Sequence, residues 1–251
     1  MDRTSSSPTS SWLLTKTGLS LTLALVLGFM IISTATAQTP QPQREIFAPT
    51  SGQGSVVVVV SGASGVPLYR DIARKLAALG YYVVLMSGND VLIMSNDQSM
   101  GVSALRSVIG EAQSAALALP GKVALIGFSM GGGGVLVNSG ALSDLVSAVV
   151  AYYPAISFMG DDMGPLASSL RAPVLLLAAE KDERACCKIV SMRALEAAPK
   201  KVALELVVYP EAGHGFNLPN SSFVYRASDT EDAWAKTVAF LAGVHPPRTP
   251  R

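Results

Sequence analysis

Ser129 is the residue whose setting points most directly to chemistry. It stands in the segment Gly127-Phe128-Ser129-Met130-Gly131, which follows an apolar run and precedes a segment of helical character. A Gly-x-Ser-x-Gly at a strand-to-helix turn holds the serine in a strained, exposed position, and its glycines are needed because neighbouring backbone leaves no room for a Cβ. The serine would also lie at a helix N-terminus, whose free N–H groups stabilise a developing oxyanion. The segment therefore predicts a serine nucleophile.

Glycine-rich turns can also bind phosphates, and the spacing here excludes both common phosphate-binding motifs. A P-loop requires lysine at a fixed distance from its first glycine, and Gly133 stands at that position. A dinucleotide-binding turn requires Gly-x-Gly-x-x-Gly. Counted from Gly131 or Gly132, the last glycine of that pattern is replaced by Leu136 or Val137. The nucleophile interpretation is the one that remains.

A serine nucleophile needs a base to take its proton and an acid to orient that base. The chain has two histidines. His245 lies in a proline-rich tail that we expect to be mobile, whereas His214 follows the predicted strand 201–210 and is the predicted base. Asp182 follows the predicted strand 172–180 and is the predicted acid, which gives the order Ser, Asp, His that is typical of α/β-hydrolases. The competing acids are Glu180, Glu183, Asp161 and Asp162.

Two backbone N–H groups are predicted to hold the oxyanion. One belongs to Met130 in the serine segment, and the other to Ala63 in the small-residue loop 61–65 that follows the first strong strand. An ordinary glycine turn is the alternative interpretation of that loop. Four apolar side chains are candidates either for an acyl pocket or for core packing: Phe128, Met130, Phe158 and Phe216.

Runs of β-branched and apolar residues alternate with segments of helical period along the chain. This alternation is typical of βαβ units, so we expect an α/β-hydrolase fold, with a mostly parallel sheet and helices on both faces. The candidate residues follow the apolar runs, at the carboxyl ends of strands where ligands bind in such sheets. Segment 155–171 interrupts the alternation and is a candidate lid. Strands are expected at 55–62, 81–86, 122–127, 147–154, 172–180 and 201–210, and helices at 67–80, 99–118, from 129, 183–198 and 230–243.

Several motifs in consistent order resemble the dienelactone hydrolase family of α/β-hydrolases over about residues 56–241. They are RDIARKLAALGYYVVLM after the first loop, GFSMGG around the serine, PVLLLAAEKD at the acid, YPEAGHGF at the base and DAWAKTVAFL in the last helix. The resemblance implies hydrolysis of carboxylic esters or lactones through an acyl-enzyme. It also implies a small-molecule ester or lactone as the binding partner and no cofactor.

Two departures from the family pattern bear on the substrate. Founding members carry cysteine where Ser129 stands, although many relatives use serine. The dienelactone specialists also carry an acid in the first loop, where this chain has only Ser, Gly and Ala at 61–65. We therefore do not expect dienelactone itself as the substrate. Two alternatives stay open: an acyltransferase that uses the same residues, and a non-catalytic relative that binds a ligand.

The N-terminal residues have the pattern of a secretory signal peptide. Arg3 and Lys16 precede an apolar run at 19–32, and a small-residue cleavage pattern ends at Ala37. We expect cleavage near Ala37 and export to the periplasm or the medium, with no stable membrane partner afterwards; an uncleaved membrane anchor is the alternative. The expected organisation is a signal peptide at 1–37, a flexible lead-in at 38–54, the α/β-hydrolase domain at 55–243 and a proline-rich tail at 244–251.

Charge and cysteine content narrow the possible partners. The net charge is +1 without a basic stripe, so the sequence does not favour nucleic acid or an anionic membrane surface as a partner. The two cysteines, Cys186 and Cys187, are adjacent, and a bridge between neighbours is strained. We expect two partly buried free thiols on a helix and, because a recognisable ligand set is missing, no metal site. The sequence does not indicate an oligomeric state.

Overall fold

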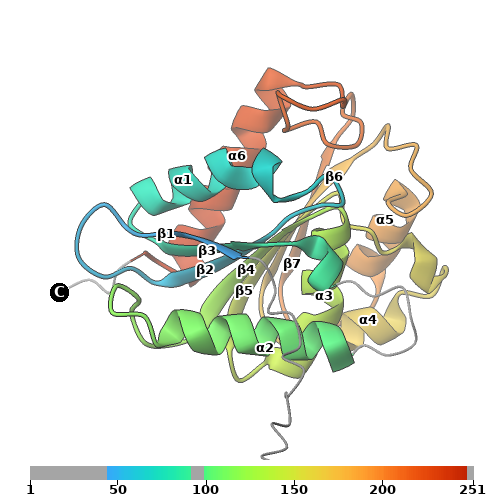
Figure 1. Cartoon of the computed structure of the whole chain (residues 1–251). Coiled ribbons are helices and arrows are strands. Elements are labelled where there is room, and N and C mark those ends of the chain that lie inside the picture. Colours follow the sequence, from blue (N-terminus) through green and yellow to red (C-terminus); the bar gives the residue numbers. More distant parts are fainter. Residues whose placement is uncertain (1–43, 92–98, 248–251) are drawn as a thin grey trace, which may run out of the picture. The chain divides into compact units, whose positions relative to one another are not determined.

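The computed structural model describes residues 44–91 and 99–247, which form an α/β fold around one sheet (Figure 1). The expected signal peptide, the first residues of the lead-in and the last four residues of the tail lie outside this part of the chain. Within it the sheet has seven strands in the order β1-β3-β2-β4-β5-β6-β7, and each neighbouring pair is parallel except β1 and β3. The strands are β1 (Arg44–Phe47), β2 (Val56–Val60), β3 (Tyr82–Met86), β4 (Val123–Phe128), β5 (Val146–Tyr152), β6 (Val174–Ala179) and β7 (Leu204–Tyr209).

Helices cover both faces of the sheet. In Figure 1, α1 and α6 lie above it, and α2, α3 and α4 lie below it. The helices are α1 (Arg70–Ala78), α2 (Ser99–Gln113), α3 (Met130–Ser139), α4 (Gly164–Ser169), α5 (Ile189–Ala197) and α6 (Ala227–Val244). In the described part of the chain, no helix combines the length and the apolar character that crossing a bilayer requires.

The five consecutive valines of β2 explain why the sheet is covered on both sides. All five are buried. Val57 and Val59 face a core cluster that includes side chains of α1 and α6. Val56, Val58 and Val60 face a second cluster with α2, α3, α4 and α5. Because successive side chains of a strand point to opposite faces, a strand without a polar residue needs an apolar layer on each side.

The α/β-hydrolase fold expected from the sequence is confirmed, with differences at the ends of some elements. Helix α2 ends at Gln113 rather than near 118, and α5 begins at Ile189 rather than near 183. The two cysteines therefore lie in a turn before α5, and the expectation that a helix carries them was wrong. Segment 155–171 contains a 3₁₀ turn and α4, whose Leu166 and Ala167 pack into the core below the sheet.

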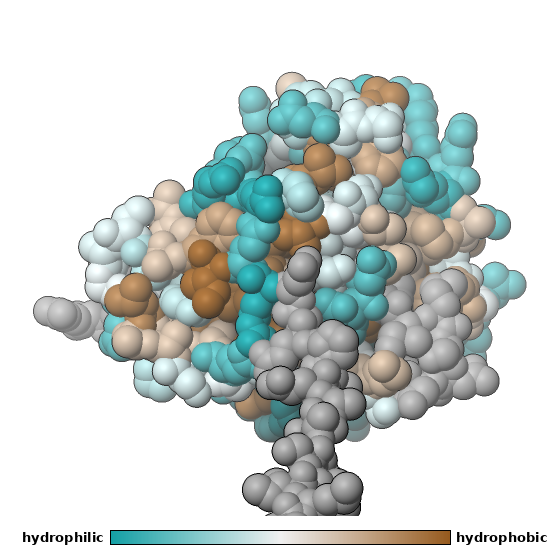
Figure 2. Space-filling view, in the orientation of Figure 1, coloured by the Kyte–Doolittle hydropathy of each residue, from teal (hydrophilic) through white to brown (hydrophobic). Residues whose placement is uncertain are grey.

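The lead-in was expected to be flexible as far as residue 54, but residues 44–47 form the edge strand β1, antiparallel to β3. Arg70 of α1 donates hydrogen bonds of 2.6 and 2.8 Å to the Glu45 carboxylate, which ties this strand to the first helix. Four residues with mixed polarity carry too little periodicity to be recognised as a strand. Apolar surface gathers around this edge of the sheet (Figure 2), where Ile46 is 58% exposed.

His245 was expected to lie in a mobile tail, and this expectation was wrong for residues 244–247. His245 is only 6% exposed and follows directly on α6. One ring nitrogen, Nε2, lies 2.9 Å from the Val56 carbonyl oxygen, and Nδ1 lies 2.9 Å from Ser147 Oγ. The Tyr81 hydroxyl donates to the His245 carbonyl, and the Ser55 N–H donates to the Pro247 carbonyl. The start of the tail is therefore anchored at the amino ends of β2 and β5.

Burial lowers the pKa of His245 below 6.5, despite the opposing effect of its bond to the Val56 carbonyl. The neutral ring is therefore the native form, with Nε2 as the donor to that carbonyl. We expect His245→Ala to reduce the free energy of unfolding by about 2 kcal/mol, because it leaves buried polar partners unpaired. Urea unfolding at pH 7.5 measures this change.

The same experiment repeated at lower pH tests the protonation state. A histidine with a lowered folded pKa contributes its full stability above the unfolded value, and that contribution falls as the pH drops through about 6.5. The difference in stability between the wild type and His245→Ala should therefore shrink between pH 7.5 and pH 5. A difference that stays constant or grows over this range contradicts the assignment of a neutral, buried imidazole.

Candidate active site

Ser129 occupies the turn between β4 and α3 with a backbone φ of +50°. L residues rarely adopt a positive φ, and strained residues of this kind persist where the surrounding structure fixes them. The Ser129 carbonyl accepts the first hydrogen bond of α3, from the Gly133 N–H at 2.9 Å. The N–H groups at the start of α3, including that of Met130, therefore have no partner within the helix.

The glycines on either side of Ser129 are explained by close backbone approach. A Cβ on Gly127 would lie 2.3 Å from the Gly131 carbonyl oxygen. A Cβ on Gly131 would lie 2.4 Å from the carbonyl oxygens of both Val60 and Ser61, at the end of β2. Both separations are shorter than any real Cβ contact, so both positions require glycine. Gly134, deeper in α3, is crowded by a side chain instead, because a Cβ there would lie 2.7 Å from Val91 Cγ2.

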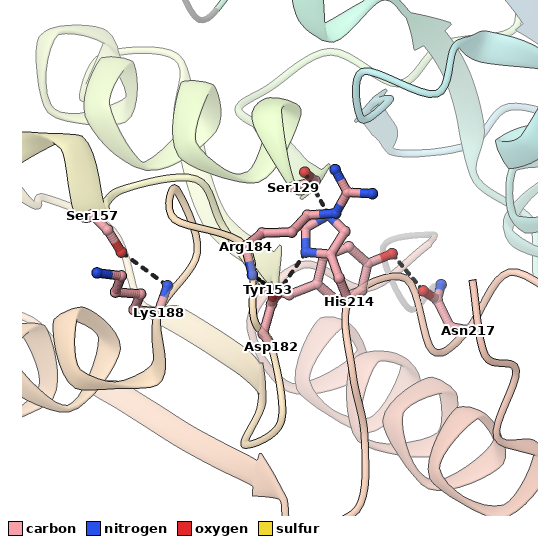
Figure 3. A network of polar contacts seen from close by, with 8 residues as sticks. All are labelled: Ser129, Tyr153, Ser157, Asp182, Arg184, Lys188, His214 and Asn217. Carbon is pink, nitrogen blue, oxygen red and sulfur yellow. Dashed lines mark hydrogen bonds and ion pairs between the residues drawn. The ribbon is translucent and has the colours of Figure 1, made fainter. Parts of the chain in front are cut away.

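His214 links Ser129 to Asp182 through hydrogen-bond contacts at both ring nitrogens (Figure 3). Nδ1 lies 2.6 Å from Asp182 Oδ2, and Nε2 lies 2.9 Å from Ser129 Oγ. The Asp182 side chain is fully buried and that of His214 is 8% exposed. Residues far apart in the sequence thus meet at the carboxyl edge of the sheet, after β4, β6 and β7.

The turn after β6 holds the Asp182 carboxylate in place. Its Oδ1 accepts a hydrogen bond of 3.0 Å from the Arg184 N–H, which leaves Oδ2 for His214. The competing acids lie elsewhere. Glu180 forms an ion pair with Arg193, and the other three acids, Glu183, Asp161 and Asp162, are exposed. Asp162 also accepts a hydrogen bond from the Gly164 N–H. Asp182 is the acid that the structure brings to His214.

Two aromatic rings pack against the His214 ring. The Tyr153 ring lies 4.8 Å away and the Phe223 ring 5.4 Å away, centroid to centroid. Tyr153 directly follows β5, has a φ of +35°, and donates a 2.6 Å hydrogen bond to Asn217 Oδ1. Burial raises the pKa of Tyr153 well above 10, so its hydroxyl stays a donor. This bond ties the loop that carries His214 to the end of β5 (Figure 3).

These supporting residues were not identified from the sequence as parts of the site. The position of Tyr153 immediately after a buried strand, at the same edge as the other site residues, was the available signal. The contact of Tyr153 with Asn217 spans 64 residues of chain, and local periodicity carries no information about such a pairing.

Loop 61–65 lies against the serine turn, as expected. A Cβ on Gly62 would lie 3.3 Å from the Ser129 Cβ. The Gly65 N–H donates to the Gly62 carbonyl at 3.1 Å, which makes a tight turn with the exposed Ala63 as its second residue. That turn uses the N–H of Gly65 and not that of Ala63.

Among the four apolar candidates, Phe128 and Phe216 are fully buried in the core cluster that faces α1 and α6. Core packing is therefore their role. Met130 is half-buried and packs against the other core cluster, and Phe158 is 42% exposed, so an acyl-pocket role stays a prediction for these two. A separate cavity of about 370 Å³ lies by α1 and α6, with Trp234, Tyr225 and Asn217 in its lining. Of the described residues that line it, none is Ser129, Asp182 or His214.

Comparison with known proteins agrees with this architecture. A family model described as the dienelactone hydrolase family matches residues 45–245. The chain belongs to the dienelactone hydrolase family. Membership makes it a carboxylic ester hydrolase, and the matched region contains Ser129, Asp182 and His214. The matched region begins within β1 and ends at His245. Both ends therefore lie in parts of the chain that were expected from the sequence to be flexible.

Individual relatives are distant. A protein of Methylorubrum extorquens, provisionally named carboxymethylenebutenolidase, is 29% identical over 210 residues, covering 74% of this chain and 70% of that protein. A solved structure from Klebsiella pneumoniae, provisionally assigned as a dienelactone hydrolase, has a TM-score of 0.63 at 24% identity, over 76% of this chain and 88% of the other. The carboxylesterase Cest-2923 of Lactobacillus plantarum has a TM-score of 0.66 at 15% identity, over 83% and 95%. These two structures support the fold.

Three side chains of this dienelactone hydrolase family member offer donor atoms of a kind that binds metals. Among the described residues, an oxygen of Asp182, the Cys187 sulfur and a ring nitrogen of His214 lie within 4.8 Å of one another. Both cysteines are free thiols. A hydrogen bond with Cys186 and burial raise the pKa of Cys187, so the buried thiol is the protonated member of the pair.

The close approach of α3 to β2 predicts that a side chain at position 131 destabilises the protein. We expect Gly131→Ala to reduce the free energy of unfolding by at least about 2 kcal/mol, because the new methyl group overlaps backbone carbonyls that cannot move independently. Esterase activity should fall as well, since relief of the overlap displaces Ser129. Urea unfolding and ester turnover measure the two effects.

Gly110→Ala is the matched control. Gly110 lies in the interior of α2, where a Cβ meets nothing within 4 Å. Alanine there should stabilise the protein by about 0.5–1 kcal/mol through its better helix propensity, with activity unchanged. If Gly131→Ala behaved like Gly110→Ala, the close-packed turn described above would be incorrect.

Proposed function

We propose that Ser129, His214 and Asp182 form a catalytic triad that hydrolyses carboxylic esters or lactones through an acyl-enzyme. The observation that carries the proposal is the continuous pair of contacts at His214, 2.6 Å to Asp182 and 2.9 Å to Ser129. Both distances suit proton transfer and tautomer fixation without rearrangement. The strained φ of Ser129, which presents its hydroxyl at the strand edge, supports the same assignment.

In this mechanism His214 transfers one proton in each half of the reaction. Ser129 Oγ attacks the acyl carbon while Nε2 takes its proton, and Asp182 stabilises the imidazolium through Nδ1–H. The tetrahedral intermediate collapses as Nε2 returns the proton to the departing alcohol oxygen, leaving the acyl group on Ser129. Water then attacks the acyl carbon as Nε2 takes its proton, and Nε2 returns that proton to Ser129 Oγ as the acid is released.

The N–H groups of Met130 and Ala63 are proposed to bind the negative oxygen of each tetrahedral intermediate. The position of Met130 at the start of α3 and the contact of loop 61–65 with Ser129 support this role. Neither N–H is used by the hydrogen bonds that close the neighbouring turns, Gly133 to Ser129 and Gly65 to Gly62. Donors fixed by backbone need no reorganisation when charge develops, which is the origin of their catalytic effect.

The first loop also bears on the substrate. It presents Ala63 and Ser64 where dienelactone specialists carry an acid, so simple carboxylic esters or other lactones are the proposed substrates. Transfer of the acyl group to an alcohol rather than to water uses the same three residues, and a product analysis with added alcohol distinguishes the two outcomes.

We also propose that the protein acts after export, following cleavage near Ala37. The support is the sequence pattern alone: basic residues, an apolar run at 19–32 and a small-residue exit. The mass of the exported product tests this. We expect an N-terminus near Gln38, and an intact N-terminus on the exported chain would favour the membrane anchor instead.

The triad is tested by labelling with a fluorescent organophosphonate and by p-nitrophenyl acetate turnover. We expect the label on Ser129, and a loss of at least about a thousandfold in kcat for Ser129→Ala and His214→Ala, as is usual when triad members are removed. Ser168→Ala is the matched control, since Ser168 is exposed on α4 and its hydroxyl bonds only the Pro165 carbonyl among the described residues. Unchanged labelling and turnover in Ser129→Ala would refute the proposal.

The oxyanion donors are tested by Ala63→Pro, which removes the N–H while keeping a small side chain. We expect kcat to fall by about 100-fold or more, the usual loss for one such donor. Ala63→Ser keeps the N–H and should retain activity close to wild type. Equal activity in Ala63→Pro and Ala63→Ser, with both variants folded by circular dichroism, would exclude Ala63 as a donor.

A further inference from the structure

Cys187 is a buried nucleophilic group beside the triad that the proposed mechanism does not use. Its side chain is inaccessible, in the turn between β6 and α5. The Cys187 N–H donates to the Arg184 carbonyl at 3.0 Å, and the neighbouring Cys186 carbonyl accepts from the Ser157 N–H at 2.9 Å. These bonds fix the turn, and the Cys187 sulfur lies within 4.8 Å of the donor atoms of Asp182 and His214.

This thiol changes what the triad can bind. A serine triad alone offers one imidazole and one carboxylate to a metal ion, which is too few ligands for a stable tetrahedral site. Thiolate sulfur, imidazole nitrogen and carboxylate oxygen are each zinc ligands, and three protein ligands with one open position are enough to hold a zinc ion. Tetrahedral zinc places its ligand atoms about 3.3–3.8 Å apart. On binding, the 2.6 Å contact between His214 and Asp182 would therefore open, and the longer separations, which reach at most 4.8 Å, would shorten.

The charges of the three groups suit a divalent cation that prefers sulfur. The Asp182 carboxylate and a Cys187 thiolate together balance two positive charges, which a buried ion requires. Hard cations such as Mg²⁺ and Ca²⁺ prefer several oxygen ligands and gain nothing from a thiol. The set therefore discriminates for Zn²⁺ and ions of similar softness.

We propose that Cys187, His214 and Asp182 form an inhibitory site for Zn²⁺, whose occupation switches the triad off. The inhibition rests on the proposed function, whereas the metal binding does not. On binding, the Cys187 S–H bond breaks, the sulfur forms a bond to zinc and the proton passes to solvent, with no change of oxidation state. Zinc also takes a ring nitrogen of His214, so Nε2 either is occupied by metal or carries the remaining ring proton. In both cases it cannot accept the Ser129 proton.

Binding is measured first, with Co²⁺ as a spectroscopic substitute for Zn²⁺ and with the Ser129→Ala variant of the full chain. We expect one Co²⁺ per chain by equilibrium dialysis and a near-ultraviolet sulfur-to-cobalt charge-transfer band. In Ser129→Ala/Cys187→Ser the band should disappear and the affinity fall at least about tenfold, because the anionic sulfur ligand is lost. Ser129→Ala/Cys186→Ser is the matched control and should keep the band. No bound metal, or a band that persists without Cys187, overturns the site.

Inhibition is measured next, on the active enzyme freed of metal by chelator. We expect Zn²⁺ to inhibit ester turnover and a chelator to restore it, with at least about tenfold more Zn²⁺ needed for half-inhibition in Cys187→Ser than in Cys186→Ser, each relative to its own uninhibited rate. Mg²⁺ should have no effect. If Ser129→Ala binds the metal but the wild-type chain shows no esterase activity, the metal site is supported and the proposed function is overturned. If the wild type is active and both cysteine variants are equally sensitive to Zn²⁺, the proposed inhibition is overturned.

Discussion

The site depends on one steric constraint, the close approach of the N-terminus of α3 to the ends of β2 and β4. Gly127 and Gly131 lie so near neighbouring carbonyls that no Cβ fits at either position. This approach compresses the strand-to-helix turn and holds Ser129 at a φ that L residues rarely adopt. The hydroxyl is thereby fixed at the edge of the sheet, and the first N–H groups of α3 are fixed beside it.

The remaining site residues are held by bonds that the turn itself does not supply. Asp182 is oriented by the Arg184 N–H, and His214 lies between the rings of Tyr153 and Phe223. The hydrogen bond from Tyr153 to Asn217 joins the end of β5 to the loop that carries His214. The buried packing around Ser129 and Tyr153 therefore compensates for the strained backbone of these two residues. Rigid support of this kind lets a triad hold its geometry before substrate binds.

Features encoded over short stretches of chain were predictable. The valine run of β2 predicted a strand buried on both faces. The spacing of the glycines around Ser129 distinguished a nucleophile turn from phosphate-binding turns. The positions of Asp182 and His214 followed from the rule that functional groups collect at the carboxyl ends of parallel strands. The structure places these three side chains in contact, while their catalytic roles remain the proposal made above.

Features that depend on long-range contacts were not predictable. Strand β1 forms because its backbone can pair with the edge of β3, and the sequence of its four residues does not by itself indicate a strand. The burial of His245 depends on Val56, which is 189 residues away in the chain. Likewise, Cys187 was seen as one of two adjacent thiols, and its nearness to His214 emerges only when the ends of β6 and β7 are brought together.

The proposed mechanism depends on the acylation of Ser129. Rapid-quench mass spectrometry during turnover of a p-nitrophenyl ester tests it most directly. We expect an acyl group to appear on the peptide containing Ser129, at a rate at least equal to steady-state turnover, and then to be lost to water. An acyl group on the peptide containing Cys187, or turnover without any covalent intermediate, would exclude Ser129 as the nucleophile.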